Sequence, residues 1–314
     1  MSKHLFGLVV TPHGTAANNR GENEGNITTL QKLLWNGEVH TTISAEAIRW
    51  ALRYYWQRSG KKVNRVWDEE TNDHKWQDED WLPWTDPHGK GKKQETYIDD
   101  DVLGFMLAEA GKAEGNEAEA TEGKGKKKQR VKGTCDKRRG ALEVTRSLSL
   151  TPFAGDITFN AKSGEKTSTS LYGTEVHATR YQYGFALTPE WLREQSRTLD
   201  VVDAVVALAE VAGNHSRFLY DFSPDSVIFR WTDDFAPRLL YGFQLDADDR
   251  LTIPEITRRV EAGDINAKEL VVGGSIADLA DGKKLKEKGA FVCGGVKTAA
   301  EEVKRRIKET LTLI

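Results

Sequence analysis

Apolar residues gather in a few short stretches of this 314-residue chain, and each stretch predicts one element. Leu5–Val10 is a continuous apolar run of strand length, which predicts a buried strand. In Thr41–Arg58 apolar residues recur three and four positions apart, which predicts a helix. Ser44 is a favourable N-cap, and Glu46 suits the positive end of the helix dipole. The predicted buried stripe of this helix is Ile48, Ala51, Leu52, Tyr55 and Trp56.

The second half of the chain continues this pattern of apolar elements. Ala141–Thr151 alternates leucine and valine with polar residues, which predicts a half-buried strand. Residues 174–188 (TEVHATRYQYGFALT) predict another strand, and Asp225–Trp231 a further one. Between them Leu199–Ala212 predicts an apolar helix that stops at Gly213, because glycine favours the end of a helix.

A last helix is predicted near the C-terminal end of the sequence. Thr298 and Glu301 have the spacing of a capping box, and Val303, Ile307 and Leu311 form an apolar stripe. The core elements then follow as strand, helix, strand, strand, helix, strand. This is the βαββαβ order of the ferredoxin-like and RRM folds, in the α+β class. Because that fold hosts many functions, the order alone assigns none.

Two polar segments interrupt the predicted core. Residues 60–140 are rich in tryptophan, glycine and charge, and contain one helical pattern, Tyr97–Gly111. Residues 153–173 are rich in glycine, serine, threonine and lysine, with a turn pattern at KSGEK. We therefore expect a core formed by residues 1–59 and 141–314, into which both segments are inserted.

Composition restricts the class of protein. The formal net charge is only -3, so the total charge does not indicate a nucleic-acid partner. The two cysteines, Cys135 and Cys293, form no CxxC motif, which argues against a zinc cluster and favours a reducing compartment. The sequence has no signal-peptide pattern and no apolar run of about 18 residues. It therefore predicts a soluble, cytoplasmic protein without a membrane partner.

Charge is strongly segregated within residues 60–140. Trp67–Trp81 is acidic, whereas Lys124–Arg139 is almost entirely basic. Blocks of one sign act within about 8–10 Å, so a nearly neutral chain can still carry a groove for a polyanion. Lysine-, glutamate- and glycine-rich runs are equally typical of solvated, disordered loops. The sequence leaves both interpretations of this run open.

No motif in the sequence indicates catalysis. The glycine spacing does not match a P-loop, and neither a Gly-x-Ser-x-Gly nor a His-Glu-x-x-His pattern occurs. Asp99–Asp101 could hold a divalent metal, although three aspartates also suit the first turn of the helix that follows them. We therefore expect no enzymatic activity, no cofactor and no resident metal.

Polar and cationic groups at the ends of elements suit RNA instead. The loop Val9–Asn26 is far longer than a turn and carries asparagines and an arginine. Arg49 and Arg53 lie four apart, on a face of the first helix different from its apolar stripe. Lys137–Gly140 (KRRG) places three cations immediately before a strand, where they could reach phosphates. The aromatic alternation in YQYGFAL is typical either of a core strand or of an RNA-stacking strand.

Four segments in order resemble one family, the backbone subunit of type I CRISPR Cascade complexes, in the branch of the DevR autoregulators. They are the first strand with NNRGENEGNITTLQKLLWNG, then ISAEAIRWALR, RRGALEVTRSLSLTPFAGD, and AGNHSRFLYDFSPDSVIFRWTDDFAPRL. Together they cover about half of the chain. The family's helix has an A-[I/W]-[R/K]-x-A-x-R pattern, which this sequence matches with Ala47, Ile48, Arg49, Ala51 and Arg53.

The resemblance implies a right-hand shape, with an RRM-like palm (1–59 and 141–314), inserted fingers (60–140) and a thumb hairpin (153–173). It implies that copies stack head to tail along a CRISPR RNA (crRNA) beside other Cascade subunits, and present the crRNA for pairing with target DNA. Such a subunit must hold phosphates and sugars and leave base edges free. The residues expected to contact RNA are Asn18, Asn19, Arg20, Arg49, Arg53, Lys137, Arg138, Arg139, Phe153 as the wedge of the thumb, Asn214, His215 and Arg217.

Two alternatives remain open at this point. Related backbone subunits of type III complexes cut target RNA with a loop aspartate, for which Asp156 or Asp99–Asp101 are the candidates here. The name of the DevR branch suggests a transcriptional autoregulator, although no helix-turn-helix pattern is evident. The charged runs of the predicted fingers match no pattern of the family.

Overall fold

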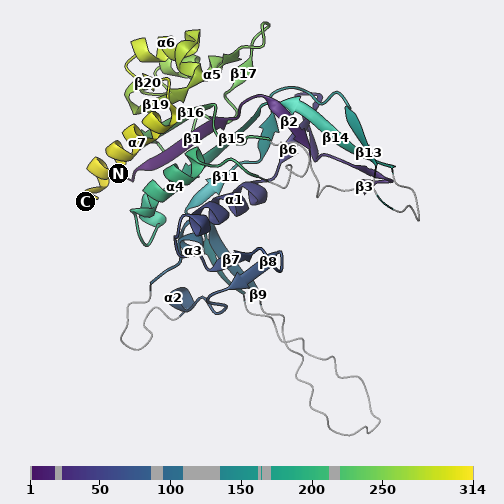
Figure 1. The fold of residues 1–314 in the computed structure, drawn as a ribbon. Helices are drawn as coiled ribbons and strands as arrows, with labels where there is room; N and C mark the ends of the chain where they lie inside the picture. The colour runs from purple at the N-terminus through teal and green to yellow at the C-terminus, as the bar shows by residue number, and fades with distance from the viewer. Residues whose placement is uncertain are drawn as a thin grey trace, which may run out of the picture.

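The computed structural model describes residues 2–17, 23–85, 95–108, 135–161, 164, 171–211 and 220–313. These residues form a mixed α+β fold around one nine-stranded sheet, to which smaller sheets and ribbons are attached (Figure 1). The predicted α+β class is therefore confirmed.

Strand β1 (His4–Val10) runs through the middle of the large sheet. It pairs antiparallel with β15 (Tyr181–Leu187) on one side and with β16 (Ser226–Thr232) on the other. All of its residues are buried, because helices or loops cover both faces of the sheet at this point. The predicted strands Leu5–Val10 and Asp225–Trp231 are confirmed. The single strand predicted at 174–188 is in fact two, because the chain leaves β14 (Leu171–Thr179) at Arg180 before it enters β15.

The sheet has the strand order β20, β19, β16, β1, β15, β12, β6 and β5, and β11 also pairs with β15. The remaining bounds are β20 Phe291–Cys293, β19 Leu270–Gly274, β12 Ser147–Ser149, β6 Glu38–Ile43, β5 Lys32–Trp35 and β11 Leu142–Val144. Along the chain, β1, helix α1 (Ala45–Arg58), β11, β15, helix α4 (Arg197–Val206) and β16 follow as strand, helix, strand, strand, helix, strand.

Helix α1 begins later than its sequence pattern predicts. Residues 41–43 belong to strand β6, and the helix starts after Ser44, whose side chain accepts a hydrogen bond from the backbone N–H of Ala47. The apolar stripe faces the core as predicted, although Tyr55 is only half-buried. Arg53 is also buried, which the sequence pattern did not predict.

Three other helix predictions need correction. Helix α4 ends at Val206 rather than at Ala212. Helix α7 (Val296–Leu311) begins after Gly295, and no side chain caps its first turn, so the predicted capping box is absent. The helical pattern predicted at 97–111 yields only the short helix α3 (Ile98–Leu103). The chain then turns at Gly104, with a φ of 71°, into strand β9 (Gly104–Ala108).

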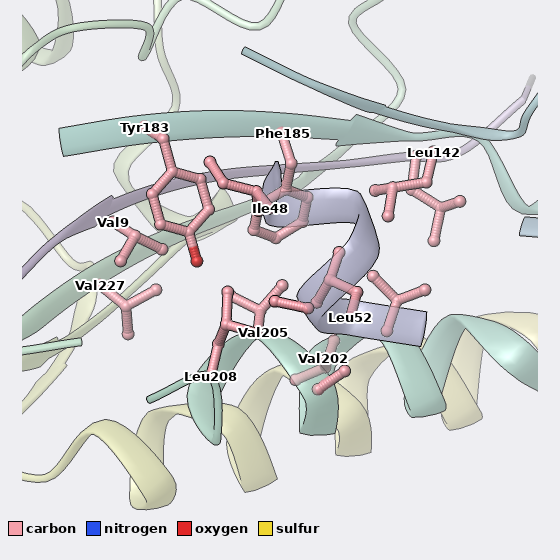
Figure 2. Close-up of a cluster of buried hydrophobic side chains, with 14 of the residues drawn as sticks. Val9, Ile48, Leu52, Leu142, Tyr183, Phe185, Val202, Val205, Leu208 and Val227 are labelled. Carbon is pink, nitrogen blue, oxygen red and sulfur yellow. The ribbon is translucent and has the colours of Figure 1, made fainter. Parts of the chain in front are cut away.

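The first hydrophobic core lies between one face of the sheet and helices α1, α4 and α7 (Figure 2). Val9 and Phe185 of the sheet face Ile48 of α1 and Val205 of α4 (Figure 2). The alternating aromatics of β15 all point into this core and are almost fully buried. They therefore pack in the core and cannot stack on RNA.

The opposite face of the sheet carries a second core. Its cover is helix α5 (Pro254–Glu261) and helix α6 (Ala280–Glu287), which pack on β1, β16 and β19. Phe6, Leu8 and Val10 supply the contribution of β1, because successive side chains of a strand point to opposite faces. None of the elements between residues 236 and 295 was predicted from the sequence.

The remaining elements lie outside the large sheet (Figure 1). The segment after α1 contains β7 (Arg65–Asp68), β8 (Asp73–Trp76), α2 (Leu82–Thr85), α3, β9 and β10 (Cys135–Arg139). Strand β14 carries β13 (Ile157–Ala161), β2 (Gly14–Ala17) and β4 (Ile27–Thr28), and β4 pairs with β3 (Asn23–Glu24). The short pieces are β17 (Gln244–Leu245), β18 (Leu251–Thr252), η1 (Pro189–Trp191), η2 (Ala267–Glu269) and η3 (Ser275–Asp278). None of the helices described has the length and apolar character needed to cross a membrane.

Candidate nucleic-acid interface

The chain that leaves β1 is fastened to strand β14. Strand β2 pairs with it from Gly14 opposite Thr179 to Ala17 opposite Val176. The buried hydroxyl of Tyr220 shares a hydrogen bond with the hydroxyl of Thr11 at 2.7 Å, and also donates to the carbonyl of Thr179 at 3.2 Å. Three segments that are far apart in sequence are thereby held together at one end of the sheet.

Two predicted groups of RNA contacts are attached at this place. Asn18, Asn19 and Arg20 follow the last described residue of β2, and Asn214, His215 and Arg217 precede Tyr220. All six lie outside the described residues. The described residues that border these two segments are Ala17 and Tyr220. Both of them contact the same strand, β14. Tyr220 was not predicted from the sequence, and no local pattern marks it.

Phe153 lies at the root of the β13–β14 hairpin. Its backbone N–H donates to the carbonyl of Val39 at 2.7 Å, and its ring lies edge-on to His177 with 5.5 Å between centroids. The ammonium of Lys32 lies 4.9 Å from the same ring. The half-buried Phe153 is thus held by three neighbours. The aromatic side chain that projects from the hairpin itself is Phe159, which is 72% exposed.

His177 helps to hold this root. Its two ring nitrogens lie 2.7 Å from the hydroxyl of Thr41 and 3.3 Å from that of Thr151. Burial lowers the pKa of His177 from the ordinary histidine value, because the charged imidazolium is poorly solvated there. A neutral ring that links two hydroxyl groups suits a structural role.

Arg49 and Arg53 point towards the segment inserted after α1. Arg53 is only 8% exposed, and its Nε donates to Asp99 Oδ2 at 3.1 Å. Burial, with the nearby Arg65, lowers the pKa of Arg53 to about 10, so it stays charged at neutral pH. The guanidinium of Arg49 donates to the carbonyl of Leu103 and is half-buried. Both arginines therefore connect α1 to α3.

Asp99 and Asp100 are buried and fully engaged. Asp99 accepts the backbone N–H groups of Asn64 at 2.7 Å and of Arg65 at 3.2 Å, in addition to Arg53. Asp100 accepts the indole N–H of Trp81 at 3.0 Å and the amide of Asn64 at 2.9 Å. Burial and the adjacent Asp99 nevertheless raise the pKa of Asp100 to about 6.

Asp101 joins three elements. One of its oxygens accepts from Arg138 of β10 at 2.7 Å, and the other accepts from Arg197 of α4 at 2.7 Å. The backbone N–H groups of Arg193 and Glu194 complete its surroundings. Asp101 therefore links α3 and β10 to the helix that packs on the sheet.

The three predicted cations Lys137–Arg139 do not share one environment. The guanidinium of Arg138 is turned inward, to Asp101 and to the ring of Trp84, whose centroid lies 4.0 Å away. Lys137 and Arg139 alternate to the other side of β10 and are exposed. Arg139 pairs with Glu143 and lies 5.3 Å from the ring of the partly exposed Trp191.

The aspartates that could have held a metal are neutralised by arginines and N–H groups instead. In the part of the chain described, no group of three His, Cys, Asp or Glu side chains is placed to hold a metal ion. Asp156 is exposed at the start of the hairpin, and its backbone carbonyl accepts the N–H of Val176 at 3.0 Å.

Comparison with known proteins shows the family of the chain. No family model matches the chain. A curated relative, the CRISPR-associated protein Cas7/Cst2/DevR of Myxococcus xanthus (strain DK1622), is 48% identical over 287 residues, which is 88% of this chain and 88% of the relative. The chain belongs to the Cas7/Cst2/DevR family. The resemblance to the DevR branch that four sequence segments indicated is thereby confirmed.

Solved structures share the fold of this Cas7/Cst2/DevR chain. A chain of a "CRISPR RNA-guided surveillance complex, pre-nicking" aligns with a TM-score of 0.54 and 10% identity, over 97% of this chain and all (100%) of that one. A chain of a second "CRISPR RNA-guided surveillance complex" aligns with a TM-score of 0.51 and 12% identity, over 96% and 99% of the two chains. The fold is therefore shared across almost the whole length, in spite of low sequence identity.

Proposed function

We propose that this protein is the crRNA-binding backbone subunit of a type I Cascade complex. It assembles head to tail along the crRNA, together with other Cascade subunits, and presents the crRNA to target DNA without catalysing a reaction. The observation that carries this proposal is the 48% identity to the Myxococcus Cas7/Cst2/DevR protein over 88% of both chains. The shared fold with chains of RNA-guided surveillance complexes supports it. Its place of action is the cytoplasm of a prokaryotic cell.

In this proposal the large sheet is an RRM-like palm. The strand order β16, β1, β15, β11, with α1 and α4 packed on one face, supports a ferredoxin-like core. Residues 60–140 are the fingers, and residues 153–173, with the hairpin β13–β14, are the thumb. The palm then consists of residues 1–59 and 141–314.

The proposed RNA path follows the end of the sheet where Ala17 and Tyr220 contact β14. Asn18, Asn19 and Arg20 contact the RNA in this proposal, and so do Asn214, His215 and Arg217. Amides and arginines suit this role because they bind phosphates and sugars without reading sequence.

The remaining predicted contacts divide by their surroundings. Lys137 and Arg139 are exposed and stay direct contacts in the proposal. Arg49, Arg53 and Arg138 are engaged inside the protein, and we assign to them the positioning of the fingers. Phe153 anchors the thumb, and the exposed Phe159 replaces it as the proposed wedge.

The test is binding of unstructured RNAs of unrelated sequence to the purified full-length protein. We expect length-dependent, salt-sensitive binding with little sequence preference, since phosphate contacts dominate. The triple variant Asn18→Ala/Asn19→Ala/Arg20→Ala should bind at least about tenfold more weakly. The control Lys283→Ala/Lys286→Ala removes two exposed cations of α6 and should bind as the wild type does.

The same protein, assembled with a crRNA, tests the non-catalytic part of the proposal. It is incubated with complementary RNA and Mg²⁺, and the RNA should remain intact. Regularly spaced cuts that disappear in Asp156→Ala would overturn the assignment in favour of an endonuclease. A wild-type protein that binds no RNA would overturn it altogether.

A further inference from the structure

Arg146 is an exposed arginine without an acidic partner among the described residues. Within the described part of the chain its Nη1 contacts two neutral groups, Gln31 Oε1 at 3.3 Å and the hydroxyl of Thr42 at 3.2 Å. Most described arginines near the sheet are engaged by carboxylates, as Arg53, Arg180 and Arg230 are. An unpaired, loosely held guanidinium is free to bind an anion.

A bulge in the sheet places Arg146 at this position. Val144 lies opposite Phe185, whereas Leu148 lies opposite Gln182. Four steps on this strand (144 to 148) therefore face three steps on β15 (182 to 185), and one residue is extra. Such a bulge turns a side chain out of the regular alternation, and bulges are frequent beside functional sites.

The strained residue Tyr241 contacts the bulge. Tyr241 has a φ of 54°, in the left-handed region that costs energy for a bulky side chain. Its hydroxyl donates to the carbonyl of Arg146 at 3.0 Å. Its neighbour Leu240 fits against Gly184 so closely that a Cβ there would lie 2.5 Å from Leu240 Cδ2. The turn is thus pressed onto the sheet beside Arg146.

Trp35 completes the surroundings from the opposite side. It ends strand β5, just before the turn Asn36–Gly37, whose φ angles of 49° and 87° fit a tight hairpin. Its ring centroid lies 5.1 Å from that of Tyr241. Both aromatic side chains are only half-buried. We call Arg146, Gln31, Thr42, Trp35 and Tyr241 together the Arg146 patch.

The Arg146 patch lies on the sheet face opposite α1 and α4. Helices α5 and α6 cover this face at β19, β16 and β1, and β5, at the other edge, is largely exposed. The patch is also close to the proposed RNA path, because Leu148 and Val10 both face Gln182, and the segment that leads through β2 to residues 18–20 leaves the sheet just after Val10. One extended RNA strand can therefore contact both the Arg146 patch and the proposed RNA path.

We propose that the Arg146 patch binds the backbone and one base of the guide RNA, an inference that rests on the proposed function. Arg146 pairs with a phosphate, and the rings of Trp35 and Tyr241 offer a stacking surface that accepts any base. The exposed Gln31 supplies an amide for a ribose hydroxyl, and the buried Thr42 helps to hold Arg146 in place. Glu38, directly opposite Trp35, repels phosphates, so the RNA backbone lies on the Arg146 side of the indole.

The experiment compares full-length variants for binding to one unstructured RNA and to the DNA strand of the same sequence, at several salt concentrations. Arg146→Ala should weaken RNA binding about tenfold and lower the salt slope by about one phosphate contact. Arg146→Lys should recover only part of the loss, because lysine lacks the bidentate fork. Trp35→Ala should weaken binding about fivefold with an unchanged salt slope.

Two matched variants guard against misfolding and general charge effects. Glu38→Gln should tighten RNA binding, which a damaged fold would not do. Lys286→Ala, on α6, should bind as the wild type does, and all variants should keep the wild-type unfolding midpoint. Photo-crosslinking of RNA that carries 4-thiouridine should label the peptide that contains Trp35 or Tyr241.

Each outcome decides the proposal. Wild-type RNA affinity in Arg146→Ala and Trp35→Ala, while the Asn18–Arg20 variant loses binding, overturns the Arg146 patch and leaves the proposed function standing. A loss confined to the DNA strand assigns the patch to target DNA and overturns the guide assignment. Failure of the wild type to bind RNA overturns both.

Discussion

Tyr183 places a phenol hydroxyl inside the first core without a hydrogen-bond partner among the described residues. Figure 2 shows the oxygen directed towards the apolar side chains of Val205 and Val227. Burial without a partner raises the pKa of Tyr183 far above the ordinary tyrosine value. A hydroxyl that loses its water on folding and gains no partner costs free energy. The rest of the ring, stacked on Phe222, contributes normally to the core.

Tyr183→Phe is therefore expected to stabilise the protein. The free energy of unfolding should rise by about 1 kcal/mol, because the buried unsatisfied hydroxyl is removed and the ring is kept. Urea unfolding at constant pH measures this change. Tyr181→Phe is the matched control on the same strand. Its hydroxyl bonds that of Thr41 at 2.7 Å, so this variant should lose stability by a similar amount. A change of the same sign in the free energy of unfolding of both variants would contradict this explanation.

Single residues also mark where sequence reasoning reaches its limit. Ser44 and the stripe of α1 could be predicted, because capping and helical periodicity are local. The role of Arg53 could not be predicted, because it depends on Asp99, which lies 46 residues further along the chain. From the sequence alone, Arg49 and Arg53 point into solvent. In the structure the inserted segment returns and covers them.

A whole helix or strand could be predicted where a single hydrophobic pattern extended over its length. The apolar runs of β1 and β16 and the stripe of α7 did so. Ala141–Thr151 was predicted as one strand, and the bulge divides it into β11 and β12, because sequence alternation does not show an extra residue against a distant partner. The hairpin β5–β6 was missed although Asn36–Gly37 is a strong local turn signal. The polar sequence before β5 concealed this strand.

Asp101 tests how the inserted elements are attached to the rest of the fold. Asp101→Ala leaves Arg138 and Arg197 without their shared carboxylate in a buried place, and should lower the free energy of unfolding by about 3–5 kcal/mol. Limited proteolysis of the folded variant should give earlier cleavage within residues 60–140. The matched control Glu143→Ala removes the exposed partner of Arg139 and should leave both measurements unchanged, because exposed ion pairs contribute little. Equal protease resistance of the Asp101 variant and the wild type would contradict the attachment.

In the whole molecule, the residues that hold the elements together lie apart from the segments proposed to contact RNA. Ion pairs between arginines and aspartates hold together the elements α1, α3, β10 and α4. The segments proposed to contact RNA are attached at the other end of β1, around β14 and Tyr220. A family resemblance could place both groups in order along the chain. It could not show which cations are already paired, because pairing depends on the packed structure.

The two phenylalanines of the proposed thumb test this separation in the assembled complex. Phe153→Ala removes a ring packed on His177 and Lys32, and should lower the free energy of unfolding by about 1–3 kcal/mol. Phe159→Ala removes an exposed ring and should leave stability unchanged. If Phe159 is the wedge, complexes of the Phe159 variant on a long RNA should lose the regular ladder of nuclease-protected positions that wild-type complexes give, since stacking on an aromatic ring contributes about 1–3 kcal/mol per base. An unchanged ladder in Phe159→Ala, together with a lost ladder in a folded Phe153→Ala, would return the wedge to Phe153. An exposed ring on the edge strand β13 can enter between nucleotides without disturbing the large sheet, whereas a ring already packed between two side chains must first leave them.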